Sequence, residues 1–215
     1  VRLMTLNKCI LIGLLGSFLM FLGDMILYYD PNDYDGRDTI NSIIGIMKNV
    51  STKRLYLGGL LGPISAFIYC IGFYHIVLSC QENYLSLACF VFLINIFGMI
   101  LGGAYHIQCA YLGLLSRYEN KGVFDEFLKF LKFQAKIVFG TMAIANIGTT
   151  LIILFGFTVF PRWQALFTPI FLLTLTPLAG RLPKGLHMII RGGWFNLIYF
   201  IYYLSLLINY TNVNL

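Results

Sequence analysis

Charged residues are scarce in this chain of 215 residues, of which only 11% are Asp, Glu, Lys or Arg. Soluble domains contain about 25% of these residues, so the scarcity excludes an ordinary soluble domain. Apolar residues make up 59% of the sequence instead. The composition therefore predicts an all-α integral membrane protein.

Acidic residues are fewer than basic ones, nine against fifteen, which gives a formal net charge of +6. A basic chain can bind nucleic acid, but here the Lys and Arg residues lie in short segments beside apolar runs. That arrangement is typical of membrane orientation. We therefore expect membrane lipids and no nucleic acid as partners, and a homo-oligomer stays open.

The short motifs of well-known membrane enzymes and metal sites are also missing. The sequence contains no G-x-S-x-G, no H-E-x-x-H or H-x-x-E-H, no H-x-x-x-H and no C-x-x-C. The five cysteines lie within or beside apolar runs, where small buried side chains are their best explanation. No reaction is predicted from motifs, and whether the protein is an enzyme stays open.

The apolar runs predict six transmembrane helices in one domain that covers residues 1–215. A helix needs about 20 apolar residues to cross a bilayer, within a range of about 17 to 25. Gly62-Pro63 interrupts the second run, and Pro169 and Pro177 are expected to kink the short fifth run. The predicted spans are 9–29, 55–79, 85–115, 137–160, 164–180 and 194–209.

Two segments between the spans have apolar residues at helical spacing and basic residues among or behind them. They are residues 39–54 and 124–136. Both patterns predict amphipathic helices that lie on an anionic membrane surface. For the second segment, an extension of the adjacent span is the open alternative.

Basic residues are distributed unequally between the two sides of the predicted bundle. Twelve Lys and Arg residues lie in the loops 30–54, 116–136 and 181–193, and three lie on the other side. Positively charged loops stay in the cytoplasm. The protein is therefore expected to be a multi-pass membrane protein with these loops cytoplasmic and both termini outside.

Two ionisable side chains inside the spans are predicted to lie at the same depth. Asp24 and His106 are about five and six residues from the same side, which places both roughly 8–9 Å below it. Gly98 and Gly102 share a helical face with His106, so another helix can approach that face closely. His75 lies near the opposite side, which excludes a haem bound by both histidines.

Three interpretations of Asp24 and His106 stay open. The two side chains form an acid/base pair beside a lipophilic ligand, they bind zinc together with His187, or they form a hydrogen bond that fixes helix packing. The cofactor is thus unknown, with zinc as one alternative. Other residues expected to line the ligand site are Tyr28, Tyr105, Gln108, Trp194 and Asn196.

The predicted function is binding, and in one version chemical conversion, of a small lipophilic molecule in an intramembrane pocket near the cytoplasmic leaflet. An ionisable group facing the inside of a membrane bundle favours such a site. One alternative is a small transporter or channel subunit, whose substrate path the proline-broken helices would line. The other is a structural membrane subunit without a pocket.

Four short patterns resemble a family of small polytopic bacterial membrane proteins known only as a domain of unknown function. The resemblance implies a similar six-span architecture in a bacterial inner membrane and brings no activity with it. The patterns are Gly23-Asp24 with Leu27-Tyr28, Gly102-Gly103 followed by His106, Pro161-Arg162-Trp163 with Pro169, and Gly192-Gly193-Trp194 with Asn196-Leu197.

Overall fold

A computed structural model describes residues 4–29, 39–118, 120–183, 186–187, 190 and 192–213. These residues form helices and turns, and none of them forms a strand of a sheet. The prediction of an all-α protein is therefore confirmed.

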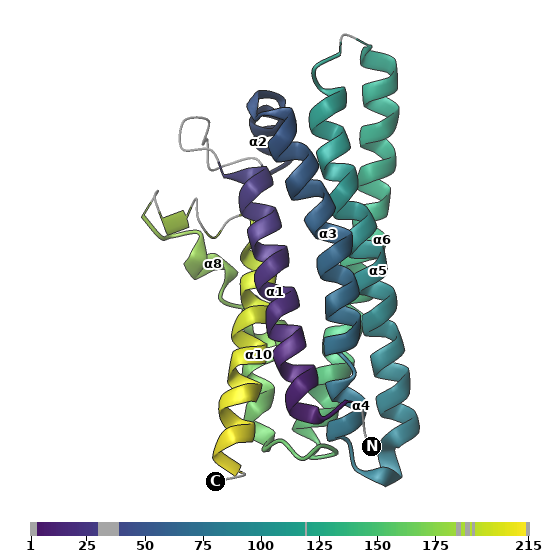
Figure 1. Cartoon of the computed structure of the whole chain (residues 1–215), viewed down its shortest axis with the longest axis vertical. Coiled ribbons are helices and arrows are strands. Elements are labelled where there is room, and N and C mark those ends of the chain that lie inside the picture. The colour runs from purple at the N-terminus through teal and green to yellow at the C-terminus, as the bar shows by residue number, and fades with distance from the viewer. Residues whose placement is uncertain are drawn as a thin grey trace.

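Four helices are long and apolar enough to cross a membrane. They are α1 (Leu6–Tyr28), α3 with α4 (Thr52–Gly72 and His75–Ser79), α5 (Leu85–Leu115) and α6 (Lys121–Leu154). Figure 1 shows them side by side, with α2 and the start of α6 at one end of the bundle, here called the α2 end. The apolar helices indicate a multi-pass membrane protein.

The predicted interruption of the second span lies at a different place. Pro63 is inside α3, which continues past it, and the helix breaks instead at Phe73 and Tyr74, before α4 begins. A proline inside a membrane helix is tolerated when neighbouring helices compensate for the missing N–H.

The predicted count of six spans is not confirmed. The fifth predicted span consists of three short helices, η2 (Arg162–Phe167), α7 (Pro169–Leu173) and α8 (Thr176–Ala179). Pro169 and Pro177 lie in the first turns of α7 and α8, where the missing N–H is harmless, but neither residue can continue a preceding helix. The sixth predicted span is α10 (Trp194–Val213), and its apolar part, Trp194–Tyr210, is shorter than the four long helices.

The two predicted interfacial segments differ in the structure. The first forms α2 (Thr39–Asn49), a separate short helix whose Ile46 and Met47 are buried. The second forms the first part of α6 and is therefore an extension of the adjacent span, as the alternative interpretation predicted. Asn120 caps this helix, because its side chain accepts a hydrogen bond from the Val123 backbone N–H at 3.2 Å.

Glycines let the helices approach one another closely. A methyl group in place of the Gly72 hydrogen would lie 2.4 Å from the Gly13 Cα, so α1 and α3 touch through their backbones. Gly103 likewise lets α5 approach α3 closely at Ala66. The Tyr203 ring of α10 lies directly over Gly13. Small residues at such crossings are the usual means by which membrane helices associate.

Candidate functional site

The structure brings Asp24 and His106 together. Asp24 Oδ1 lies 3.3 Å from His106 Nδ1, and each side chain is 7% exposed. Asp24 belongs to the inner face of α1 and His106 to the inner face of α5. Their equal depth, deduced from the number of residues to the ends of the spans, is what allows them to meet.

Glycines on α3 make room for the His106 ring. A methyl group at Gly62 would lie 2.5 Å from His106 Cδ2, so the ring occupies the space that this side chain would otherwise fill. One turn earlier, the Gly58 carbonyl oxygen lies 2.9 Å from His106 Nε2. A carbonyl oxygen only accepts hydrogen bonds, so Nε2 must carry a proton.

The two side chains face each other through an ion-pair contact. With Nε2 directed at the Gly58 carbonyl oxygen, Nδ1 is the ring nitrogen that faces the Asp24 carboxyl group, at 3.3 Å from Oδ1. Each polar group gives the other a partner at a depth where a polar group without one would be costly.

Asn196 and Tyr69 complete a network that joins four helices. The Asn196 side-chain amide donates to Asp24 Oδ2 at 2.7 Å, and the Tyr69 hydroxyl donates to Asn196 Oδ1 at 3.2 Å. Helices α1, α5 and α10 thus meet at one carboxyl group, and α3 joins them through Tyr69 and the Gly58 carbonyl oxygen. Among the described residues, each polar atom of Asp24 and His106 already faces a protein group.

The other residues expected at the ligand site lie at different distances from the pair. Tyr28 presents its ring edge-on to His106, with ring centroids 6.5 Å apart. Tyr105 packs against Phe139 of α6, with centroids 6.3 Å apart. Tyr28 thus contacts the His106 ring, and Tyr105 contacts α6.

Trp194 and Gln108 point elsewhere, because residues two positions apart on a helix face different directions. The Trp194 indole N–H donates to Oγ1 of Thr176, a residue of α8, at 2.9 Å. Gln108 is half-buried, and its Oε1 has no hydrogen-bond partner within the described residues. Each is two residues from the side chain that does enter the network, Asn196 or His106.

The part of the chain that the structure describes contains no set of ligands for the zinc alternative. No group of three or more His, Cys, Asp or Glu side chains lies close enough there to hold a metal ion. His187, the third ligand in that alternative, lies within this described part. The pair alone offers two ligand groups, both already hydrogen-bonded, and structural zinc sites have four.

A groove on the outer face of α1 is a feature that the sequence did not reveal. It is open, has a volume of about 470 Å³, and is lined by Leu22, Met25, Ile26, Tyr29 and Arg54. Four of these residues, three in α1 and Tyr29 directly after it, have the spacing i, i+3, i+4 and i+7, which places them in one stripe on the side opposite Asp24. This spacing was the only available signal, and it is equally typical of any helix face that contacts lipid.

Arg54 forms the polar end of this groove. Its Nε donates to the Ile26 carbonyl oxygen at 2.9 Å, and its Nη2 donates to the Tyr29 carbonyl oxygen at 2.7 Å. The last carbonyl groups of a helix have no partners within the helix and carry partial negative charge, so a cation there stabilises the end of α1.

The fold and the site define an integral membrane helical bundle with a buried carboxyl–imidazole pair. Residues 3–213 match the model of DUF6796, a family of unknown function, and the chain belongs to that family. The resemblance to a family of unknown function that the short sequence patterns suggested is therefore confirmed. No curated protein and no solved structure matches the chain.

Proposed function

We propose that the protein binds a small lipophilic molecule in the membrane, in the groove on the outer face of α1. The observation that carries this proposal is the groove itself: an apolar stripe that ends at the guanidinium group of Arg54. Its volume is within the range of about 300–1,000 Å³ that ligand sites occupy. Apolar walls with one charged group at the end suit a ligand with a hydrocarbon body and a polar head.

Binding, rather than chemical conversion, is the activity that the geometry favours. Asp24 and His106 are covered by protein, and their side chains contact each other. Asp24 also accepts a hydrogen bond from Asn196, and His106 donates one to the Gly58 carbonyl oxygen. Their role in the proposal is to hold the last turns of α1 against α3 and α5, since the same turns present the groove on their other side. Tyr28 packs against the His106 ring within that support.

The groove opens near the α2 end of the bundle, because Tyr29 follows the last residue of α1 and Arg54 lies in the first turn of α3. The unequal distribution of Lys and Arg supports a cytoplasmic position for this end, with both termini outside. We therefore propose that the ligand enters from the cytoplasmic leaflet, and the sequence resemblance supports a bacterial inner membrane.

Filling the groove should displace the ligand without affecting the interior. In Leu22→Trp, the larger ring enters the groove from a half-buried position on α1. Mass spectrometry of the purified protein should then show at least about fivefold less bound lipophilic molecule, which corresponds to about 1 kcal/mol of binding free energy.

The matched control is Leu15→Trp, which places the same ring on the same helix at a position that is 50% exposed and outside the groove. It should retain the wild-type amount of ligand. Equal amounts of bound molecule in the two variants would refute the proposed site.

A further inference from the structure

The first part of α6 has lysines and exposed aromatic side chains on one face. Lys129, Lys132 and Lys136 have the spacing i, i+3 and i+7, so they form one stripe along the helix, here called the lysine stripe. Phe133 lies within this stripe and is 61% exposed, and Phe130 beside it is 53% exposed. Large apolar rings are costly in water, and charged groups are costly in hydrocarbon. The lysine stripe therefore suits the boundary between the two.

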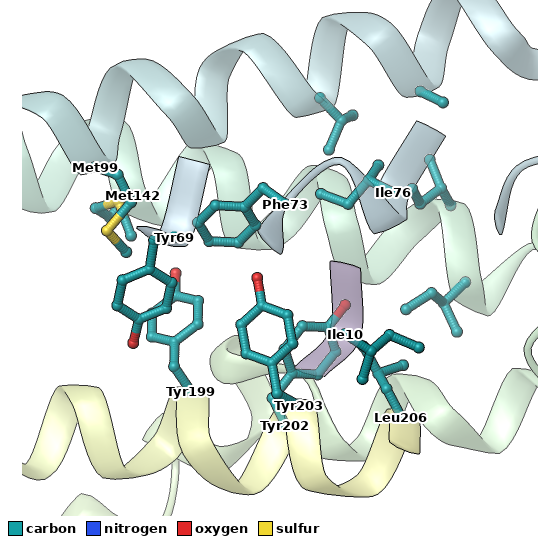
Figure 2. Packing of buried hydrophobic residues seen from close by; sticks show 14 of the residues in the cluster. Ile10, Tyr69, Phe73, Ile76, Met99, Met142, Tyr199, Tyr202, Tyr203 and Leu206 are labelled. Carbon is teal, nitrogen blue, oxygen red and sulfur yellow. The ribbon is translucent and has the colours of Figure 1, made fainter. Parts of the chain in front are cut away.

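The bundle leaves the lysine stripe uncovered. The opposite face of α6 enters the core through buried residues such as Leu131 and Met142, and Figure 2 shows Met142 beside Met99 of α5. On the outer face, Gly140 continues the stripe one turn beyond Lys136, and a methyl group there would meet no other atom within 4 Å. From the first lysine to this glycine, about three turns of α6 are thus open to the surroundings.

The depth of the lysines follows from the length of α6. Residues 137–154 of this helix contain no charged residue, and at 1.5 Å per residue they extend about 27 Å, close to the roughly 30 Å of a hydrocarbon core. Lys132 and Lys136 lie within about 8 Å of this apolar part, which is about the thickness of one headgroup layer. Figure 1 shows that α6 stands upright here and rises past α2 beside the end of α5. Its lysines therefore meet the headgroup layer from the side.

The order of charges along α6 indicates the sign of the partner. Asp125 and Glu126 lie nearer the start of the helix and thus farther from the hydrocarbon core. Glu126 pairs with Lys129 at 2.6 Å, but both side chains are more than 70% exposed, and such surface pairs contribute little. Lys132 and Lys136 have no carboxylate partner among the described residues. Unpaired positive charge therefore lies at the headgroup level, with negative charge above it, an order that suits anionic headgroups better than an acidic macromolecule approaching from the water.

We propose that the lysine stripe binds the headgroup of an anionic phospholipid in the leaflet at the α2 end. Lys132 and Lys136 are four residues apart, so they are neighbours on the helix surface, with about 5–6 Å between their Cβ atoms. Two lysines at this distance can bind the same phosphate group. Long lysine side chains can also lie along an apolar surface while their charged ends reach the headgroups. Basic clusters directly outside a membrane helix attract anionic lipids in this way.

The same lipid accounts for the apolar part of this face. The exposed Phe133 ring, between the two lysines in sequence, packs against the first carbons of the acyl chains. Beyond Lys136, the open surface at Gly140 lets an acyl chain lie against the α6 backbone. Apolar contact and attraction to anionic lipid add together at such surfaces. This lipid is separate from the molecule in the α1 groove, because no α6 residue lines that groove.

The test is a titration of the purified protein in detergent with phosphatidylglycerol, which is anionic, and with phosphatidylcholine of the same acyl chains, which is zwitterionic. Native mass spectrometry counts the bound lipids and gives the two values of Kd. The wild type should bind phosphatidylglycerol at least about thirtyfold more tightly, the equivalent of about 1 kcal/mol for each of two lysines. The double substitution Lys132→Gln with Lys136→Gln should remove this about thirtyfold difference and leave the affinity for phosphatidylcholine unchanged.

The matched control is Lys48→Gln with Lys53→Gln, because both lysines are exposed at the α2 end and the variant has the same net charge. It should keep the wild-type affinities. Leu22→Trp, which fills the α1 groove, should also keep the preference for phosphatidylglycerol, so the two proposals fail independently. Equal wild-type affinities for the two lipids, or equal losses in the two lysine variants, would overturn the proposal. So would a dimer in the same spectra that the Lys132 and Lys136 substitutions dissociate, since the face would then belong to a second copy.

Discussion

Gly72→Ala is expected to lower the free energy of unfolding by about 3 kcal/mol or more, at the upper end of the cost of overpacking. The added methyl group would lie 2.4 Å from the Gly13 Cα and 2.7 Å from the Gly13 backbone nitrogen. Backbone atoms cannot rotate away as a side chain can, so α1 and α3 would have to separate. That separation would also loosen the Tyr203 ring over Gly13. Thermal unfolding in detergent measures the loss.

Gly140→Ala is the control for this substitution. Gly140 lies in α6, and a methyl group there would meet no other atom within 4 Å. Alanine favours a helix over glycine by up to about 1 kcal/mol, so this variant should be as stable as the wild type or slightly more stable. Equal melting temperatures for the two variants would show that α1 and α3 do not touch at Gly72.

Asp24→Ala should cost about 3 kcal/mol, because it removes one member of a buried pair and leaves its partners unsatisfied. The His106 Nδ1 and the Asn196 amide would both lose their hydrogen-bond partner at a depth where water is scarce. The helices that meet at this carboxyl group would lose their common contact. The measurement is again thermal unfolding in detergent.

Asp24→Asn should be far milder, at less than about 1 kcal/mol. An asparagine has the shape of the protonated carboxylic acid: its N–H₂ can donate to a neutral His106 Nδ1, and its oxygen can accept from Asn196. Single hydrogen bonds between membrane helices contribute only about 0.6 kcal/mol on average, so small differences in their geometry cost little. A loss for Asn as large as that for Ala would show that the site needs the carboxyl group itself and not only its shape and its hydrogen bonds.

Much of the fold could be predicted because long apolar runs have one main explanation. Each of the four long helices overlaps a predicted span, and α5 has the predicted boundaries, Leu85–Leu115, whereas α6 begins at Lys121 and ends at Leu154 instead of covering 137–160. The fifth predicted span is not one continuous helix, because an apolar run of 17 residues with two prolines can have the composition of a span without forming one helix. Hydropathy measures affinity for lipid, whereas continuity of a helix depends on backbone hydrogen bonds that proline removes.

The contact between Asp24 and His106 could also be predicted, because residue counts give depth and glycine spacing gives the face that meets another helix. The rotation of α10 could not be predicted. Trp194 and Asn196 were both expected beside the pair, but residues two apart on a helix diverge, and only Asn196 reaches Asp24. The Arg54 groove was hidden for a different reason, since contacts between a side chain and the end of another helix leave no pattern in the sequence.

Nitrogen NMR of histidine-labelled protein in lipid bilayers at neutral pH tests the central claim most directly. We expect the His106 Nε2 to carry a proton, as the Gly58 carbonyl oxygen requires, and the Nδ1 signal to change in Asp24→Asn, because Nδ1 lies 3.3 Å from the Asp24 carboxyl group. The Nε2 proton should remain in that variant. An unprotonated Nε2 in the wild type, or an Nδ1 signal that the substitution leaves unchanged, would contradict the contacts on which the account of this site rests.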